Sequence, residues 1–160
     1  MQTSAKRRFG LLVVAVAALL ALSACSYVMG SVEFEDGGLS ASQERYLVKI
    51  GMIDKGEDVR FFTSGGLDFE ESGHLFTDVR VGAYWLPDHT DKEDRVEWIL
   101  LKDVQAIELT ETDAWTYSDY VTVTPEKGDP LKVYLPGSDG FPKRFHEALT
   151  KQWEKVKAQK

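Results

Sequence analysis

Cysteine is nearly absent from the 160-residue chain, which contains only Cys25. No disulfide bond can form within one chain, so a folded domain must be stabilised by its own hydrophobic core. Histidine is scarce too, and His74, His89 and His146 belong to no HExxH or similar motif. CxxC, GxSxG, P-loop and GxGxxG patterns are also missing. We therefore expect a protein that is not an enzyme, with no catalytic residue, no cofactor and no metal site.

Positive charge is in short supply as well, with 19 Lys and Arg against 26 Asp and Glu and a net charge of −7. Lys6, Arg7 and Arg8 are the only charges before Cys25, so the rest of the chain carries −10. An acidic surface repels phosphate groups, which argues against binding to nucleic acid or anionic lipid headgroups.

The N-terminal segment is the longest apolar stretch of the chain. A basic head is followed by 14 uncharged residues, 9–22, and then by Ser23, Ala24 and Cys25. Spanning a bilayer takes roughly 20 apolar residues, so this stretch is short for a permanent anchor and suits the core of a signal peptide. Val28 and Met29 could lengthen the apolar stretch, which would favour an uncleaved anchor. Ordinary cleavage without lipidation is the other alternative.

The residues Leu22, Ser23, Ala24 and Cys25 resemble the lipobox of bacterial lipoproteins. The resemblance implies that signal peptidase recognises Leu22 to Ala24 and cuts after Ala24, and that Cys25 carries a diacylglycerol thioether and often a further fatty acid such as palmitate. Two or more acyl chains hold a protein stably on a membrane. Ser26 is not the Asp associated with retention in an inner membrane. We therefore expect a periplasm-facing or surface protein, on the outer membrane if the organism has one and otherwise on the cell membrane.

The remaining chain is predicted to form a tether and one domain. Residues 1–24 would be the signal peptide, 25–40 the lipidated cysteine and a glycine-containing tether, and 41–160 a single globular domain. A short helix is predicted within 41–53, with Ser40 or Ser42 as N-cap and Gly51 opposing it.

Alternating hydrophobicity predicts six or seven antiparallel strands after that helix. The segment 74–86 is the longest of them, with Val79, Val81, Ala83 and Trp85 on one face. The other predicted strands lie in 59–63, 95–101, 104–109, 120–124 and 131–135.

The last segment changes to helical periodicity. Phe141, Phe145, Leu149 and Trp153 recur every four residues, which predicts an amphipathic helix with a buried face. Pro142 suits its first turn, and Ser138 or Asp139 could cap it.

This order of elements, from about residue 43 to 157, resembles bacterial pleckstrin-homology-like domains. The matching segments are "KGEDVRFF", "HLFTDVRVGAYWL", "WILLKDVQAIEL" and the closing helix of the form Phe-x3-Phe-x3-Leu-x3-Trp. The resemblance implies an α+β fold, a strongly bent antiparallel sheet capped by the C-terminal helix. Headgroup-binding members use a basic loop between the first two strands. Here that loop, "TSGGLDFEES", has three acids and no basic residue, so we expect no specific anionic headgroup.

A few side chains are candidates for binding. Trp115, Tyr117 and Tyr120 form an aromatic cluster that either packs in the core or anchors a partner. Residues 142–160 hold six Lys or Arg and two Glu, which form either the solvated back of a helix or a contact surface that includes Lys143 and Arg144.

Two predicted turns can be considered as binding sites for calcium or phosphate. The acidic segment 88–94 lacks the pattern of a calcium-binding loop, and Gly65-Gly66 lacks the helix and lysine of a phosphate cradle.

The sequence thus predicts a membrane-anchored lipoprotein whose non-catalytic domain binds or scaffolds an envelope protein. A carrier of a small ligand or lipid, and an accessory subunit of an envelope enzyme, are the alternatives.

Overall fold

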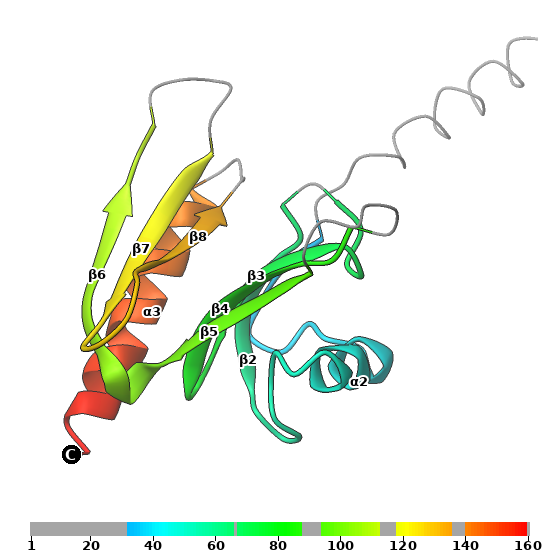
Figure 1. Cartoon of the computed structure of the whole chain (residues 1–160), viewed down its shortest axis with the longest axis horizontal. Helices are drawn as coiled ribbons and strands as arrows, with labels where there is room; N and C mark the ends of the chain where they lie inside the picture. The colour runs from blue at the N-terminus through cyan, green and yellow to red at the C-terminus, as the bar shows by residue number, and fades with distance from the viewer. Residues whose placement is uncertain (1–31, 66, 88–93, 113–117, 136–139, 160) are drawn as a thin grey trace, which may run out of the picture. The chain divides into compact units, whose positions relative to one another are not determined.

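The computed structural model describes residues 32–159, apart from 66, 88–93, 113–117 and 136–139 (Figure 1). The first sheet has the strand order β1-β2-β3-β4-β5, with β1 (Glu33–Glu35), β2 (Val59–Thr63), β3 (Ser72–Thr77), β4 (Arg80–Trp85) and β5 (Arg95–Leu100). The second sheet has the order β6-β7-β8, with β6 (Val104–Thr110), β7 (Asp119–Pro125) and β8 (Leu131–Leu135). The other elements are α2 (Ala41–Lys49), the 3-10 turn η2 (Leu101–Asp103) and α3 (Phe141–Lys157).

The first sheet is covered on both faces. Phe61 and Phe62 are consecutive in β2 and therefore point to opposite faces, yet both are buried. Phe61 belongs to a core shared with the second sheet and α3, whereas Phe62 belongs to a core under α2 that includes Leu47 and Tyr84. A strand buried on both faces loses the apolar-polar alternation that marks a half-exposed strand.

Helix α2 begins with a capping box. The Ser40 hydroxyl accepts the Gln43 backbone N–H, and the Gln43 side chain accepts the Ser40 backbone N–H. The helix ends at Lys49, because Gly51 turns the chain with a positive φ of 75°. The predicted helix and the Ser40 cap are therefore confirmed, with an earlier end than Ile53.

Helix α3 covers one face of the second sheet. Phe141, Phe145 and Leu149 are buried against the core that also contains Val121 and Val133. Trp153 is only partly buried, and its indole N–H donates to the Val104 carbonyl at 3.1 Å.

The cap predicted for this helix was wrong. Its N-cap is Gly140, with φ 76° and no side-chain hydrogen bond, and the expected caps Ser138 and Asp139 lie outside the described residues. Pro142 does occupy the first turn.

The predicted α+β fold with antiparallel strands and a closing helix is confirmed, but its details differ. The described strands number eight and form two sheets, instead of six or seven in one bent sheet. The additional strand is β1, which lies in the segment expected to be tether, and its Phe34 ring stacks on Phe62 at 4.9 Å. Segment 74–86 contains a hairpin, so Val79 lies in a turn and is 40% exposed.

Candidate binding cleft

One face of the first sheet changes character along its strands. Three cross-strand rows lie on it, Phe76–Val81–Ile99, His74–Ala83–Glu97 and Ser72–Trp85–Arg95. The first row packs into the core with α3, whereas the other two rows line a cleft. The same face therefore supports the core at one end and presents a surface for binding at the other.

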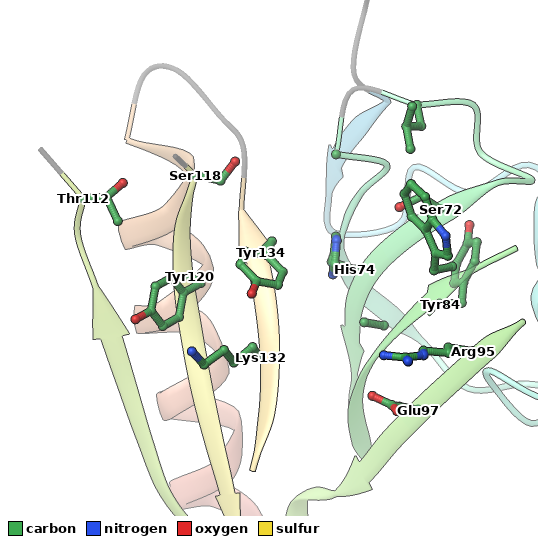
Figure 2. A pocket seen from close by; sticks show the side chains of 14 residues that line it. Ser72, His74, Tyr84, Arg95, Glu97, Thr112, Ser118, Tyr120, Lys132 and Tyr134 are labelled. Carbon is green, nitrogen blue, oxygen red and sulfur yellow. The ribbon is translucent and has the colours of Figure 1, made fainter. Parts of the chain in front are cut away.

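The opposite wall of the cleft is the second sheet. In β7 and β8 the odd-numbered residues, such as Val121 and Val133, face the core under α3. The side chains of Tyr120, Lys132 and Tyr134 alternate with them and line the cleft (Figure 2). Strand β8 lies against β3 and β4, so α3 occupies one side of the junction between the sheets and the cleft occupies the other.

The cleft has a volume of about 640 Å³, within the range of roughly 300–1,000 Å³ that is usual for ligand sites. Its described lining includes the aromatic side chains of Tyr84, Trp85, Tyr120 and Tyr134, and Trp85 and Tyr134 are 48% and 47% exposed. The Tyr120 and Tyr134 rings pack together at 5.8 Å. Large half-exposed aromatic side chains that stand in a cleft are the groups that most often anchor a partner.

His74 is the most unusual polar group of the cleft. It lies in β3 facing Tyr134, whose ring meets the imidazole edge-on at 6.2 Å (Figure 2). Its Nδ1 atom is buried and has no hydrogen-bond partner among the described residues. Burial lowers the pKa of His74 to about 4, so the imidazole is neutral at physiological pH. A neutral imidazole offers one donor and one acceptor to a ligand.

Charged groups stand on both walls. The Lys132 ammonium lies over the Tyr120 ring at 4.7 Å, and Arg95 and Glu97 lie on the opposite wall. Lys132 and Arg95 outnumber Glu97, so this cleft has a local excess of positive charge in a chain of net charge −7. The cleft can therefore bind by stacking, hydrogen bonding and attraction of an anionic group.

Tyr84 has a structural role at the back of this site. Burial is the main cause that raises its pKa, and the nearby Tyr46 and then Glu70 raise it further. Its hydroxyl donates to the Phe69 carbonyl, which fastens the β2–β3 loop to β4. A phenol so far from titration is a hydrogen-bond donor at any physiological pH.

A second polar cluster surrounds Arg80. Its guanidinium, whose side chain is 6% exposed, pairs with Glu57 and, at 2.5 Å, with Asp54, and it lies 4.5 Å from the centre of the Trp98 ring. Thr77 donates to Glu57 as well. This arrangement pairs the buried charge with two carboxylates and ties the β3–β4 turn to the segment before β2, while the Arg80 Nε atom has no hydrogen-bond partner among the described residues.

The residues predicted from sequence are distributed unevenly. Of the aromatic cluster, Tyr120 lines the cleft, whereas Trp115 and Tyr117 lie outside the described residues. Lys143 and Arg144 lie on α3, away from the cleft, and pair with Glu111 at 3.1 Å and Glu35 at 2.7 Å. Leu22, Ser23, Ala24 and Cys25 also lie outside the described residues.

Sequence reasoning missed His74, Lys132 and Tyr134. The pattern of β8 did place Lys132 and Tyr134 on one face of a strand. A strand pattern alone, however, does not tell which other sheet that face meets, so the cleft had no signature in the sequence.

Two further observations concern metal binding and membrane-spanning helices. Among the described residues no group of three His, Cys, Asp or Glu side chains could hold a metal ion. Within the same part of the chain, no helix has the length and apolarity needed to cross a membrane.

Comparison with known proteins identifies the fold. No protein-family model and no curated protein matches the sequence. A crystal structure of a DUF1696 family protein with a pleckstrin-homology domain, from Shewanella loihica PV-4, matches with a TM-score of 0.50. The two chains are 15% identical, and the match covers 80% of this chain and 99% of the other. The fold is pleckstrin-homology-like. The sequence-based resemblance is thus confirmed for the pleckstrin-homology-like domain, and the likeness shows its fold alone.

Proposed function

We propose that this chain is a bacterial lipoprotein anchored through Cys25, and that its pleckstrin-homology-like domain binds a protein partner in the cell envelope through the cleft. The observation that carries the binding role is the cleft itself, because half-exposed Trp85 and Tyr134 stand on facing walls with polar groups between them. The anchor is supported by the lipobox resemblance of residues 22–25.

The start of the domain suits a short anchor. The Val32 and Ser64 segments are joined by two hydrogen bonds of 3.0 Å, and the adjacent Gly65 lines the cleft. Six residues lie between Cys25 and Val32, and the seven fully extended steps from one to the other span at most about 25 Å. A partner bound in the cleft would therefore be held near the membrane surface.

A carrier of a small ligand is the second candidate. The volume of about 640 Å³ and the unpartnered Nδ1 of His74 favour it, since small-molecule sites combine apolar walls with a few polar groups. Native mass spectrometry of the purified protein separates the two functions, because a carrier would retain a bound small molecule of constant mass.

The anchor is tested by replacing its acceptor. Cys25→Ala should abolish incorporation of labelled fatty acid and leave an unprocessed precursor. Normal labelling and processing of the variant would contradict the lipoprotein assignment.

The cleft is tested in living cells with a photo-crosslinking phenylalanine analogue in place of Tyr134. We expect a covalent adduct with one envelope protein. The same analogue at Lys151, exposed on α3, is the matched control and should give no adduct. Absence of an adduct at Tyr134, or equal adducts at both positions, would contradict partner binding in the cleft.

A further inference from the structure

The outer edge of β5 is unpaired among the described residues. Strand β5 ends the first sheet and pairs only with β4 within that part of the chain. In Figure 1, β5 and β6 diverge from η2, where they are joined. Arg95 and Glu97 of β5 line the cleft, and the edge of this strand therefore borders the open side of the cleft.

The backbone groups on that edge can be assigned from two hydrogen bonds. The Leu86 N–H donates to the Glu71 carbonyl, and the Leu101 N–H donates to the Val79 carbonyl. In an antiparallel ladder, hydrogen-bonded pairs alternate with non-hydrogen-bonded pairs. In this register Arg95 and Glu97 bond to β4, so the N–H and C=O groups of Val96 and Trp98 point outward.

Charges make this edge selective. Charged side chains on an edge strand discourage indiscriminate pairing, and β5 carries Arg95 and Glu97. An added strand would place every second side chain on the cleft face of the first sheet, beside Arg95 and Glu97 and toward Lys132 and Tyr134 of the opposite wall. The Lys132 ammonium would attract a carboxylate there, and the ring of Tyr134 would pack against an apolar group.

We propose that an extended, acidic segment of a partner protein pairs with the outer edge of β5 and fills the cleft. One of its Asp or Glu side chains would lie near Lys132, and an apolar side chain two residues away would lie against Tyr134. This inference rests on the proposed partner-binding function and specifies the chemistry of that partner. Strand addition to an exposed edge is a general mode of peptide recognition, in which main-chain bonds supply affinity and pockets supply specificity.

Val96 offers a matched pair of variants. Val96→Pro removes an outward N–H that the ladder with β4 does not use, and an edge strand tolerates proline at such a position. Val96→Ala keeps that N–H and removes similar packing from the core under α2. A difference between the two variants therefore reports the outward N–H rather than the side chain.

The probe is a phage-displayed library of random dodecapeptides, selected on the full-length lipoprotein in detergent micelles. We expect enriched peptides to carry Asp or Glu two residues from an aromatic or long aliphatic residue. Their affinity should fall at least tenfold in Val96→Pro and less than threefold in Val96→Ala. Lys132→Glu should lower it at least tenfold and should improve binding of peptides in which the acid is replaced by Lys. Unchanged thermal unfolding of each variant verifies the fold.

Other outcomes would overturn the inference. No enrichment, enrichment without an acidic preference, or equal affinity in the two Val96 variants would each exclude this mode of binding. A chain that is dimeric in the wild type and monomeric in Val96→Pro would show that a second copy uses the edge instead. If the Tyr134 adduct forms in cells while the Val96 variants bind equally, the proposed function stands and only the strand pairing fails.

Discussion

At the scale of single residues, His74 couples the cleft to the stability of the domain. Its pKa is about 4 in the folded protein, lowered by burial, against 6.5 for an unperturbed histidine. Between these values the unfolded chain binds a proton that the folded chain does not. The stabilisation that depends on a neutral His74 is therefore complete above pH 6.5 and is lost as the pH falls toward 4.

This linkage predicts a measurable pH dependence. Between pH 7 and pH 5 the free energy of unfolding should fall by about 2 kcal/mol more in the wild type than in His74→Gln, since each pKa unit is worth about 1.4 kcal/mol. Urea unfolding at the two pH values measures the difference, and His74→Phe should behave as His74→Gln does. Parallel pH profiles for all three proteins would mean that His74 titrates normally.

Gly82 is a residue whose identity is dictated by its neighbours. A Cβ atom there would lie 2.3 Å from Met52 Cε and 2.5 Å from the backbone oxygen of Glu97. The methionine can move, but the carbonyl belongs to the β4–β5 ladder. Gly82→Ala should therefore lower the free energy of unfolding by about 1–3 kcal/mol, the usual cost of overpacking. A urea midpoint equal to that of the wild type would show that β4 and β5 accommodate the added methyl group without a loss of stability.

Single residues also show where prediction from the sequence succeeds. Ser40 and Gln43 form their capping box from local chemistry alone, and the cap was predictable. Gly140 has no side chain that could cap a helix, so the start of α3 was not predictable from the sequence. Tyr134 and His74 are remote in sequence and meet only because two sheets pack, which no local pattern encodes.

At the scale of elements, burial on one face or two decides how well a pattern can be interpreted. Helix α3 and strand β8 bury one face each, and their periods of four and two residues predicted them correctly. Strand β2 was also predicted with its correct bounds, 59–63, but it buries both faces, and the pattern did not indicate that Phe62 is buried as well as Phe61. Strand β1 has only three residues and was missed as part of the tether, because so short a segment carries no period.

The docking of α3 gives a prediction at this scale. Leu149 is fully buried in the core between the two sheets. Leu149→Ala should lower the free energy of unfolding by about 2–5 kcal/mol, since it removes buried methyl groups and leaves a cavity. Lys151→Ala, on the exposed face of the same helix, should change it by less than about 0.5 kcal/mol. Denaturant unfolding that shows equal effects would mean that the helix is not docked through Leu149.

At the scale of the whole molecule, charge decides which surfaces it can approach. The β2–β3 loop, where headgroup-binding members of the fold family would be basic, carries Asp68, Glu70 and Glu71 and no basic residue in 64–71. The first two cations of α3 are already paired, Lys143 with Glu111 and Arg144 with Glu35. The basic character of residues 142–160 is therefore concentrated toward the C-terminal turns.

This distribution predicts the behaviour of the unlipidated chain, residues 26–160, toward anionic vesicles. Each exposed lysine near a membrane contributes at most about 1 kcal/mol, and the attraction is screened within about 8 Å at roughly 0.15 M salt. Co-sedimentation with phosphatidylserine vesicles should therefore show no binding at that salt concentration. Weak binding at about 0.01 M salt should disappear in Lys151→Gln/Lys155→Gln. Tight binding that persists at high salt and in this variant would instead make a lipid headgroup the ligand, because only a built anion site resists both screening and the loss of surface lysines.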